Sequence, residues 1–243
     1  SELINALFFA DLQSRLLPTG VGRTTLCPVE ILWDPARPPG VRLLPIESRE
    51  GPRALREHIL DIDSWFQVPL DPSAPEGLAT ACAAIAETMT ATAEDAASLG
   101  FGGGTSPVEI PRWRYAVVNL PHPLLQAGLV ILDTPGYNTM GVEPELTVHR
   151  IPDAAAILFM LSADTGVTRT DRDLWTEHIE TIHGLEQSCY VVLNKIDGLR
   201  DGFKPETQLL GEIDKQVKST ADALGVAPAR VFAVSAKQGL VAK

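Results

Sequence analysis

Three short polar segments, each directly after an apolar run, hold residue types that could bind a nucleotide. The run "VILDTPG" ends in residues 133–136, which match the pattern DxxG, and "VVLNKID" ends in residues 194–197, which match NKxD. The run "FAVSAK" ends in Ser-Ala-Lys at 235–237. Taken alone, the first is typical of a turn, the second is moderately specific, and the third is uninformative. Their order, with each at the carboxyl end of a separate predicted strand, favours a guanine-nucleotide site over coincidence.

Alternating strands and helices in the carboxyl-terminal half would position these segments. Thr170 and Asp173 match a capping box at the start of one helix, and a second helix begins at Pro205 and stops at Gly225. Strands separated by helices predict an α/β fold with right-handed crossovers and a mostly parallel sheet, which binds ligands beyond the carboxyl ends of its strands. The predicted strands are 114–120, 128–134, 154–163, 189–195 and 230–236, and the predicted helices are 170–183 and 205–225.

The amino-terminal half reads as a helix followed by a region of mixed elements. The segments 27–34 and 41–48, joined by "PARPPG", predict a β-hairpin, and 52–65 and 75–98 predict two helices. The glycine run 102–104 is interpreted as a linker. The apolar residues expected on one face of the opening helix are Leu3, Ile4, Leu7, Phe8 and Leu12.

Composition excludes several classes of function. The net charge of −11 provides no overall basic field, so nucleic acid is not expected as the main partner. Three unevenly spaced cysteines indicate reduced thiols in a cytoplasmic protein. The longest apolar run, 154–161, is too short to span a bilayer. No two histidines stand four apart on one predicted helix, so no zinc site is predicted.

The ordered motifs resemble those of the P-loop GTPases. By this resemblance, Asp197 accepts hydrogen bonds from the guanine ring and its exocyclic amine, which adenine does not offer in that pattern. Asn194 braces the base site, the Lys195 stem covers the base, and the Ala236 amide meets the guanine carbonyl. The full set of implied nucleotide contacts is Ser1, Thr25, Asp133, Thr134, Pro135, Gly136, Asn194, Lys195, Asp197, Ser235, Ala236 and Lys237.

The resemblance also gives a role to the first residue. "SELINALF" is similar to the sequence that follows the lysine of GxxxxGK[ST], so Ser1 is interpreted as a Mg²⁺ ligand, together with Thr25 and, through water, Asp133. On this interpretation the phosphate loop and a central strand precede Ser1, and the chain is incomplete at both ends. We therefore expect residues 1–243 alone to bind GTP very weakly and to lack activity.

The spacing of the motifs resembles that of the dynamin superfamily, and of bacterial dynamin-like proteins in particular. Thr25 and Pro28 match a T-x-x-P element, and residues 29–112 would form an insertion before the strand of "HPLLQAGLVILDTPG". The resemblance implies a three-layer α/β/α GTPase domain over residues 1–243, with its first strand and P-loop absent. It also implies a homodimer across the nucleotide face and membrane remodelling, peripheral to the inner membrane, through regions outside this chain.

Two functions remain open at this point. The first is an active GTPase in which Thr25 positions metal and water and Gly136 steadies the γ-phosphate during in-line attack by water. The second is a GTP-gated binding or scaffold module with little turnover, built on the same fold. Tyr137 stands where Ras-like enzymes carry the glutamine that orients the attacking water, and dynamins likewise lack that glutamine. A ribosome-associated GTPase is disfavoured by the acidic charge and the long insertion. An intact GxxxxGK before Ser1 would favour the first function over the second.

Overall fold

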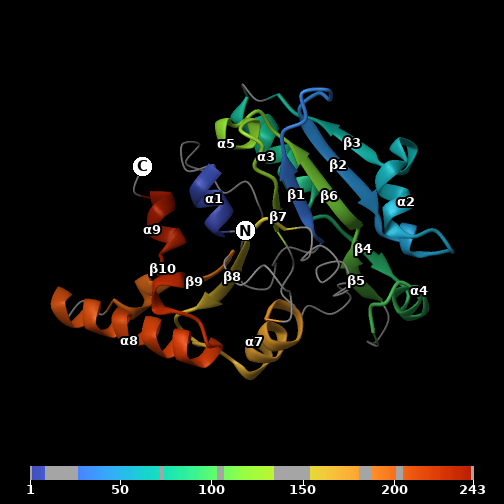
Figure 1. Ribbon diagram of the computed structural model, residues 1–243. Coiled ribbons are helices and arrows are strands. Elements are labelled where there is room, and N and C mark those ends of the chain that lie inside the picture. The colour runs from blue at the N-terminus through green and yellow to red at the C-terminus, as the bar shows by residue number, and fades with distance from the viewer. Residues whose placement is uncertain are drawn as a thin grey trace. The chain divides into compact units, whose positions relative to one another are not determined.

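The computed structural model describes residues 2–8, 27–71, 74–102, 107–133, 154–180, 188–200 and 205–241 (Figure 1). The chain divides into two compact units, residues 1–144 and 145–243. The fold is α/β, with parallel and antiparallel strand pairs and helices. Among the described residues, no helix combines the length and the apolar character needed to cross a membrane.

A five-stranded sheet forms the centre of the first unit. Its strand order is β3 (Phe66–Pro69), β2 (Gly40–Pro45), β6 (Trp113–Asn119), β1 (Val29–Leu32) and β7 (Ile131–Asp133). All seven residues of β6 are buried, as expected for a central strand covered on both faces. Strand β1 pairs with β6 in parallel, and the other neighbours in this sheet are antiparallel.

The predicted hairpin of 27–34 and 41–48 is wrong, because β6 lies between β1 and β2. The loop joining these two strands crosses the end of β6, where the side chain of Asn119 binds its backbone. Asn119 Oδ1 accepts from the Asp34 amide at 2.7 Å, and Nδ2 donates to the carbonyls of Asp34, Arg37 and Pro38 at 3.0–3.2 Å. These bonds fix the loop across the end of β6, the strand that lies between β1 and β2.

The predicted helix 75–98 is also wrong. It consists of α3 (Pro75–Ala84), β4 (Thr88–Ala91) and α4 (Ala93–Ser98), and β4 pairs with β5 (Val108–Pro111). Trp113 Nε1 donates to the Ala84 carbonyl at the end of α3, at 2.7 Å. Thr92 starts α4 by accepting from the Asp95 amide at 3.1 Å. The β-branched threonines between the two helices favour the extended conformation, which the alanine content of the segment hides.

The remaining helices of the first unit are short. The predicted helix 52–65 consists of α2 (Leu55–Leu60) and η3 (Ile62–Ser64), and the others are α1 (Glu2–Phe8), η2 (Ile46–Arg49) and α5 (Pro123–Gln126). In α1, Ile4 and Phe8 are buried in the core, whereas the Leu7 side chain, expected on the same face, is 55% exposed. Leu12 and residues 103–104 of the expected linker lie outside the described residues.

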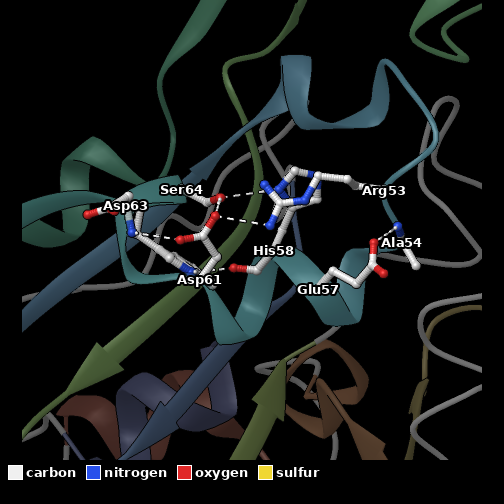
Figure 2. Close-up of polar contacts among 8 residues, drawn as sticks. Arg53, Ala54, Glu57, His58, Asp61, Asp63 and Ser64 are labelled. Atoms are coloured by element: carbon white, nitrogen blue, oxygen red, sulfur yellow. Dashed lines mark hydrogen bonds and ion pairs between the residues drawn. The ribbon is translucent and has the colours of Figure 1, made fainter.

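A polar network closes the turn that follows α2 (Figure 2). Asp61 Oδ2 accepts from Arg53 Nη2 and from Ser64 Oγ, each at 3.0 Å, and Ser64 Oγ lies 3.3 Å from His58 Nδ1. Trp65 Nε1 donates to the His58 carbonyl at 3.0 Å. The His58 side chain is buried, and its Nε2 has no hydrogen-bond partner among the residues that the structure describes. Burial and the positive charges of Arg53 and Arg114 lower the pKa of His58, outweighing nearby carboxylates.

The second unit contains three of the five strands that the sequence predicted for one mostly parallel sheet. The strands predicted at 114–120 and 128–134 are instead β6 and β7 of the first unit's sheet, in which most neighbouring strands are antiparallel. The strand order in the second unit is β10 (Val231–Ala233), β9 (Cys189–Asn194) and β8 (Ile157–Ser162), and both pairs are parallel. The predicted helix 205–225 is confirmed as α8 (Glu206–Leu224), which ends at Gly225 in the left-handed conformation with φ of 67°. Shorter helical segments are η6 (Ile196–Leu199), η7 (Pro228–Arg230) and α9 (Ala236–Val241).

The helix predicted at 170–183 starts earlier than expected. It comprises α7 (Arg169–Leu174) and the π-helical turn η5 (Trp175–Ile179), and residues 181–187 lie outside the described residues. The capping box is formed by Thr168 and Asp171, two positions before the predicted pair. Trp175 and Ile179 are buried against the sheet together with Phe159 of β8 and Leu224 of α8. This core fixes the strand ends that carry the polar motifs.

Candidate functional site

Asn194, the last residue of β9, links two of the predicted motifs. Its side-chain Oδ1 accepts from the Lys195 amide at 2.8 Å and from the Ala236 amide at 3.0 Å. The Ile196 amide donates to the Val234 carbonyl at 3.3 Å and supports the same junction. The NKxD loop and the start of α9 are therefore held together at the carboxyl ends of β9 and β10, as the motif order predicted.

Asp197 and Ser235 form the second link. Ser235 Oγ donates to Asp197 Oδ1 at 2.7 Å and accepts from the Gln238 amide at 3.1 Å, so that the same hydroxyl caps α9 and holds the carboxylate. Within the described part of the chain, Asp197 Oδ2 accepts no hydrogen bond, and the residue is half-buried. A carboxylate fixed through one oxygen can present the other to a ligand that carries N–H donors.

Sequence reasoning missed one residue of this region. Asp164, which follows β8, places Oδ2 3.7 Å from Lys195 Nζ and accepts from Ser162 Oγ at 3.3 Å. The signal in the sequence was its position: "SAD" follows a buried strand, as each recognised motif does. Lys237 lies exposed on α9, one residue beyond the buried Ala236.

The first unit contributes Asp133, the last residue of β7, which pairs with Val29 of β1. Burial, reinforced by the negative charge of Asp133, raises the pKa of the Cys27 thiol to about 12. The other predicted site residues Ser1, Thr25, Thr134, Pro135 and Gly136 lie outside the described residues. The structure thus brings together Asn194, Lys195, Asp197, Ser235 and Ala236, whereas Asp133 belongs to a different unit.

A family model and a curated relative point to the same family. A family model described as "Dynamin family" matches residues 1–196. A curated bacterial dynamin-like protein of Nostoc punctiforme is 32% identical over 89 residues, which are 37% of this chain and 12% of that protein. The chain therefore spans only a small part of the curated relative's length.

The solved structures show the same fold. A chain from an oligomerised bacterial dynamin pair superposes with a TM-score of 0.55 at 15% identity, over 99% of this chain and 32% of that one. A second structure of such a pair gives a TM-score of 0.52 with the same identity and coverage. Both are described as providing a mechanism for the long-range sensing and tethering of membranes.

Proposed function

The chain belongs to the dynamin family, and we propose that the protein binds GTP and GDP and hydrolyses GTP. The observation that carries this proposal is the pair of links between the NKxD loop and the start of α9. Asn194 holds the backbone of both segments, and Ser235 holds the carboxylate of Asp197. These are the contacts that a rigid guanine site needs, because its donors and acceptors must be in place before the base arrives.

The proposed base recognition follows from the second carboxylate oxygen of Asp197, which accepts no hydrogen bond from the residues that the structure describes. Guanine presents a ring N–H and an exocyclic amine side by side, and a carboxylate can accept from both. Adenine has an acceptor in place of that ring N–H, so a bound adenine would leave the carboxylate poorly paired and be rejected. We propose that the Ala236 amide donates to the guanine carbonyl and that the Lys195 stem lies along the base.

For the phosphates we propose Mg²⁺ held by Ser1, Thr25 and, through water, Asp133. This donor set consists of hydroxyl and carboxylate oxygens, the hard ligands that Mg²⁺ prefers. When bound, the ion would neutralise charge that develops on the phosphate oxygens. Thr25 would position the attacking water, and the Gly136 amide would contact the γ-phosphate, together with Thr134 and Pro135 of the same segment. Ser235 and Lys237 complete the proposed nucleotide-contacting set.

We further propose that two copies pair across the nucleotide face and that the protein acts peripherally at a membrane from the cytoplasm. The descriptions of the bacterial dynamin structures as an oligomerised pair that senses and tethers membranes support this proposal. We also propose that residues 29–112 form the dynamin-type insertion and that residues 1–243 form one GTPase domain.

The base-site proposal is tested by Asp197→Asn, with GDP, ADP and xanthosine diphosphate as competing ligands. An asparagine amide donates where the carboxylate accepted, so affinity for GDP should fall and affinity for xanthosine diphosphate should rise. Asp222→Asn is the matched control, because Asp222 lies exposed on α8 in the same unit. Unchanged GDP affinity in Asp197→Asn would contradict the assignment.

Turnover distinguishes the enzyme from a GTP-gated scaffold. The rate of GTP hydrolysis per molecule should rise with protein concentration if pairing across the nucleotide face stimulates it. GTP binding without turnover would favour the scaffold, and turnover independent of concentration would contradict the pairing.

A further inference from the structure

Lys195 has a backbone conformation that its residue type rarely adopts. With φ of 67° and ψ of 29° it is left-handed, and among the described residues it is the only non-glycine residue with positive φ. Such a conformation costs roughly 1 kcal/mol or more and persists where the surroundings hold it. Its amide donates to Asn194 Oδ1 at 2.8 Å, and its carbonyl accepts from the Gly198 amide at 2.9 Å. The backbone of Lys195 is thus held on both sides.

The third constraint acts on the side chain. Lys195 Nζ lies 3.7 Å from Asp164 Oδ2, with the two side chains 62% and 49% exposed. A pair this exposed adds little to the stability of the fold. Its consequence is geometric: it favours one direction for a long, flexible side chain. Asp164 is itself oriented by Ser162 Oγ, which donates to the same oxygen at 3.3 Å.

Gly198 leaves the space that this carboxylate occupies. A Cβ added to Gly198 would lie 2.8 Å from Asp164 Oδ1, which is closer than real contacts allow. Apart from its chain neighbours, the described part of the chain places one other atom within 4 Å of this Cβ, namely Asp164 Cγ at 3.9 Å. An alanine at 198 would therefore displace the carboxylate, the mobile end of a side chain, and leave the backbone in place.

We infer that Asp164 is a positioning residue for guanine-nucleotide binding: it holds the Lys195 ammonium, and so lays the lysine stem along the face where the base binds. This inference rests on the proposed function. It adds a residue outside the three recognised motifs, and it explains why the residue after Asp197 is a glycine.

A double-mutant cycle tests whether Asp164 acts through Lys195. The dissociation constant for GDP is measured in the full-length protein with Asp164→Ala, Lys195→Ala and both changes. Asp164→Ala should raise the constant about two- to five-fold, the range of an exposed ion pair. In the Lys195→Ala background the same change should have no effect, because the group that Asp164 orients is gone. An equal loss in both backgrounds would indicate a merely structural role and overturn the inference.

Gly198→Ala provides an independent arm. It should weaken GDP binding in the wild-type background and have no effect in Asp164→Ala, where no carboxylate meets the new methyl group. Asp222→Ala, on the exposed surface of α8, is the control for loss of one negative charge and should leave affinity unchanged. A loss from Gly198→Ala that persists in Asp164→Ala would overturn the inference.

Different measurements test the proposed function and the role of Asp164. If the wild-type protein binds neither GDP nor GTP, the proposed function fails, and the role of Asp164 in binding fails with it. If wild type binds and the cycle shows no coupling, only the inference fails. Without nucleotide, the ¹³C resonance of reductively methylated Lys195 should shift in both Asp164→Ala and Gly198→Ala, and an unchanged resonance would contradict the ion pair.

Discussion

Asn119→Ala should destabilise the first unit more than any surface change of similar size. The side chain is 4% exposed and bonds four backbone groups of the loop between β1 and β2. Nδ2 has two hydrogens to share among three carbonyls, which counts as two hydrogen bonds. With the bond that Oδ1 accepts, the side chain makes the equivalent of three. At about 1 kcal/mol net for each, the loss is roughly 3 kcal/mol. Water can reach the exposed part of this loop, so the estimate takes no added penalty for unpaired groups.

Urea unfolding followed by tryptophan fluorescence measures this loss as a lower midpoint. In a thermal scan, roughly 3 kcal/mol corresponds to about 6–12 °C in Tm for a domain of this size. Asn119→Asp keeps the acceptor for the Asp34 amide but replaces the donor by an oxygen facing three carbonyls, so it should destabilise at least as much. Gln126→Ala, which removes an exposed amide on α5, should stay within about 0.5 kcal/mol of wild type. A loss below about 1 kcal/mol in Asn119→Ala would refute the claim that this side chain organises the loop.

Three further outcomes are expected. Ser235→Ala removes the bond to Asp197 and the cap of α9, so calorimetry should show about tenfold weaker GDP binding, and Ser235→Thr should restore it. Because the pKa of His58 is lower in the folded protein, the unfolded chain binds a proton at this residue more readily than the folded protein does. The free energy of unfolding should therefore fall as the pH drops below about 6.5. In urea titrations at pH 5–7, His58→Gln should reduce this dependence on pH. Burial raises the pKa of Cys27 and Cys82 to about 12, so neither should react with Ellman's reagent at pH 8 until the protein is unfolded; fast labelling in the native state would contradict their burial.

The second unit follows closely from its sequence because each of its strands lies within a clear apolar run and its longest helix has recognisable ends. The apolar runs at 154–163, 189–195 and 230–236 all contain strands of one parallel sheet, and Pro205 and Gly225 bracket α8. The start of α7 was predicted two residues too late. Two Thr-x-x-Asp patterns stand two residues apart, and the earlier one forms the capping box. A capping box alone does not say which of two overlapping matches begins the helix.

The first unit was harder to predict because its decisive contacts are distant in sequence. Asp34 and Asn119 are 85 positions apart, and nothing in "PARPPG" indicates that a later strand separates β1 from β2. The strands β3 and β5 have four residues each and end in proline, which gives too short a pattern to recognise. For the β1–β2 connection and for these short strands, the strands that they pair with determine the conformation more than local propensity does.

For the candidate site, sequence motifs predicted the main polar residues but not the residue that orients Lys195. The motifs identified Asn194, Asp197 and Ser235, which carry the bonds that join the NKxD loop to α9. Asp164 was missed because a single aspartate after a strand has no motif around it. Its role depends on distances to Lys195 and Gly198 that only a folded chain defines.

The insertion of β6 between β1 and β2 has a consequence for the order of folding. During synthesis β1 and β2 emerge together, yet Val29 must wait for Ala116 and Val41 for Val118 before their central partner exists. Until then both strands present unpaired edges rich in apolar residues, a state prone to association with other chains. Closing so long a stretch of chain is slow compared with zipping a hairpin. We therefore expect this sheet to be completed only after "WRYAVVN" has left the ribosome.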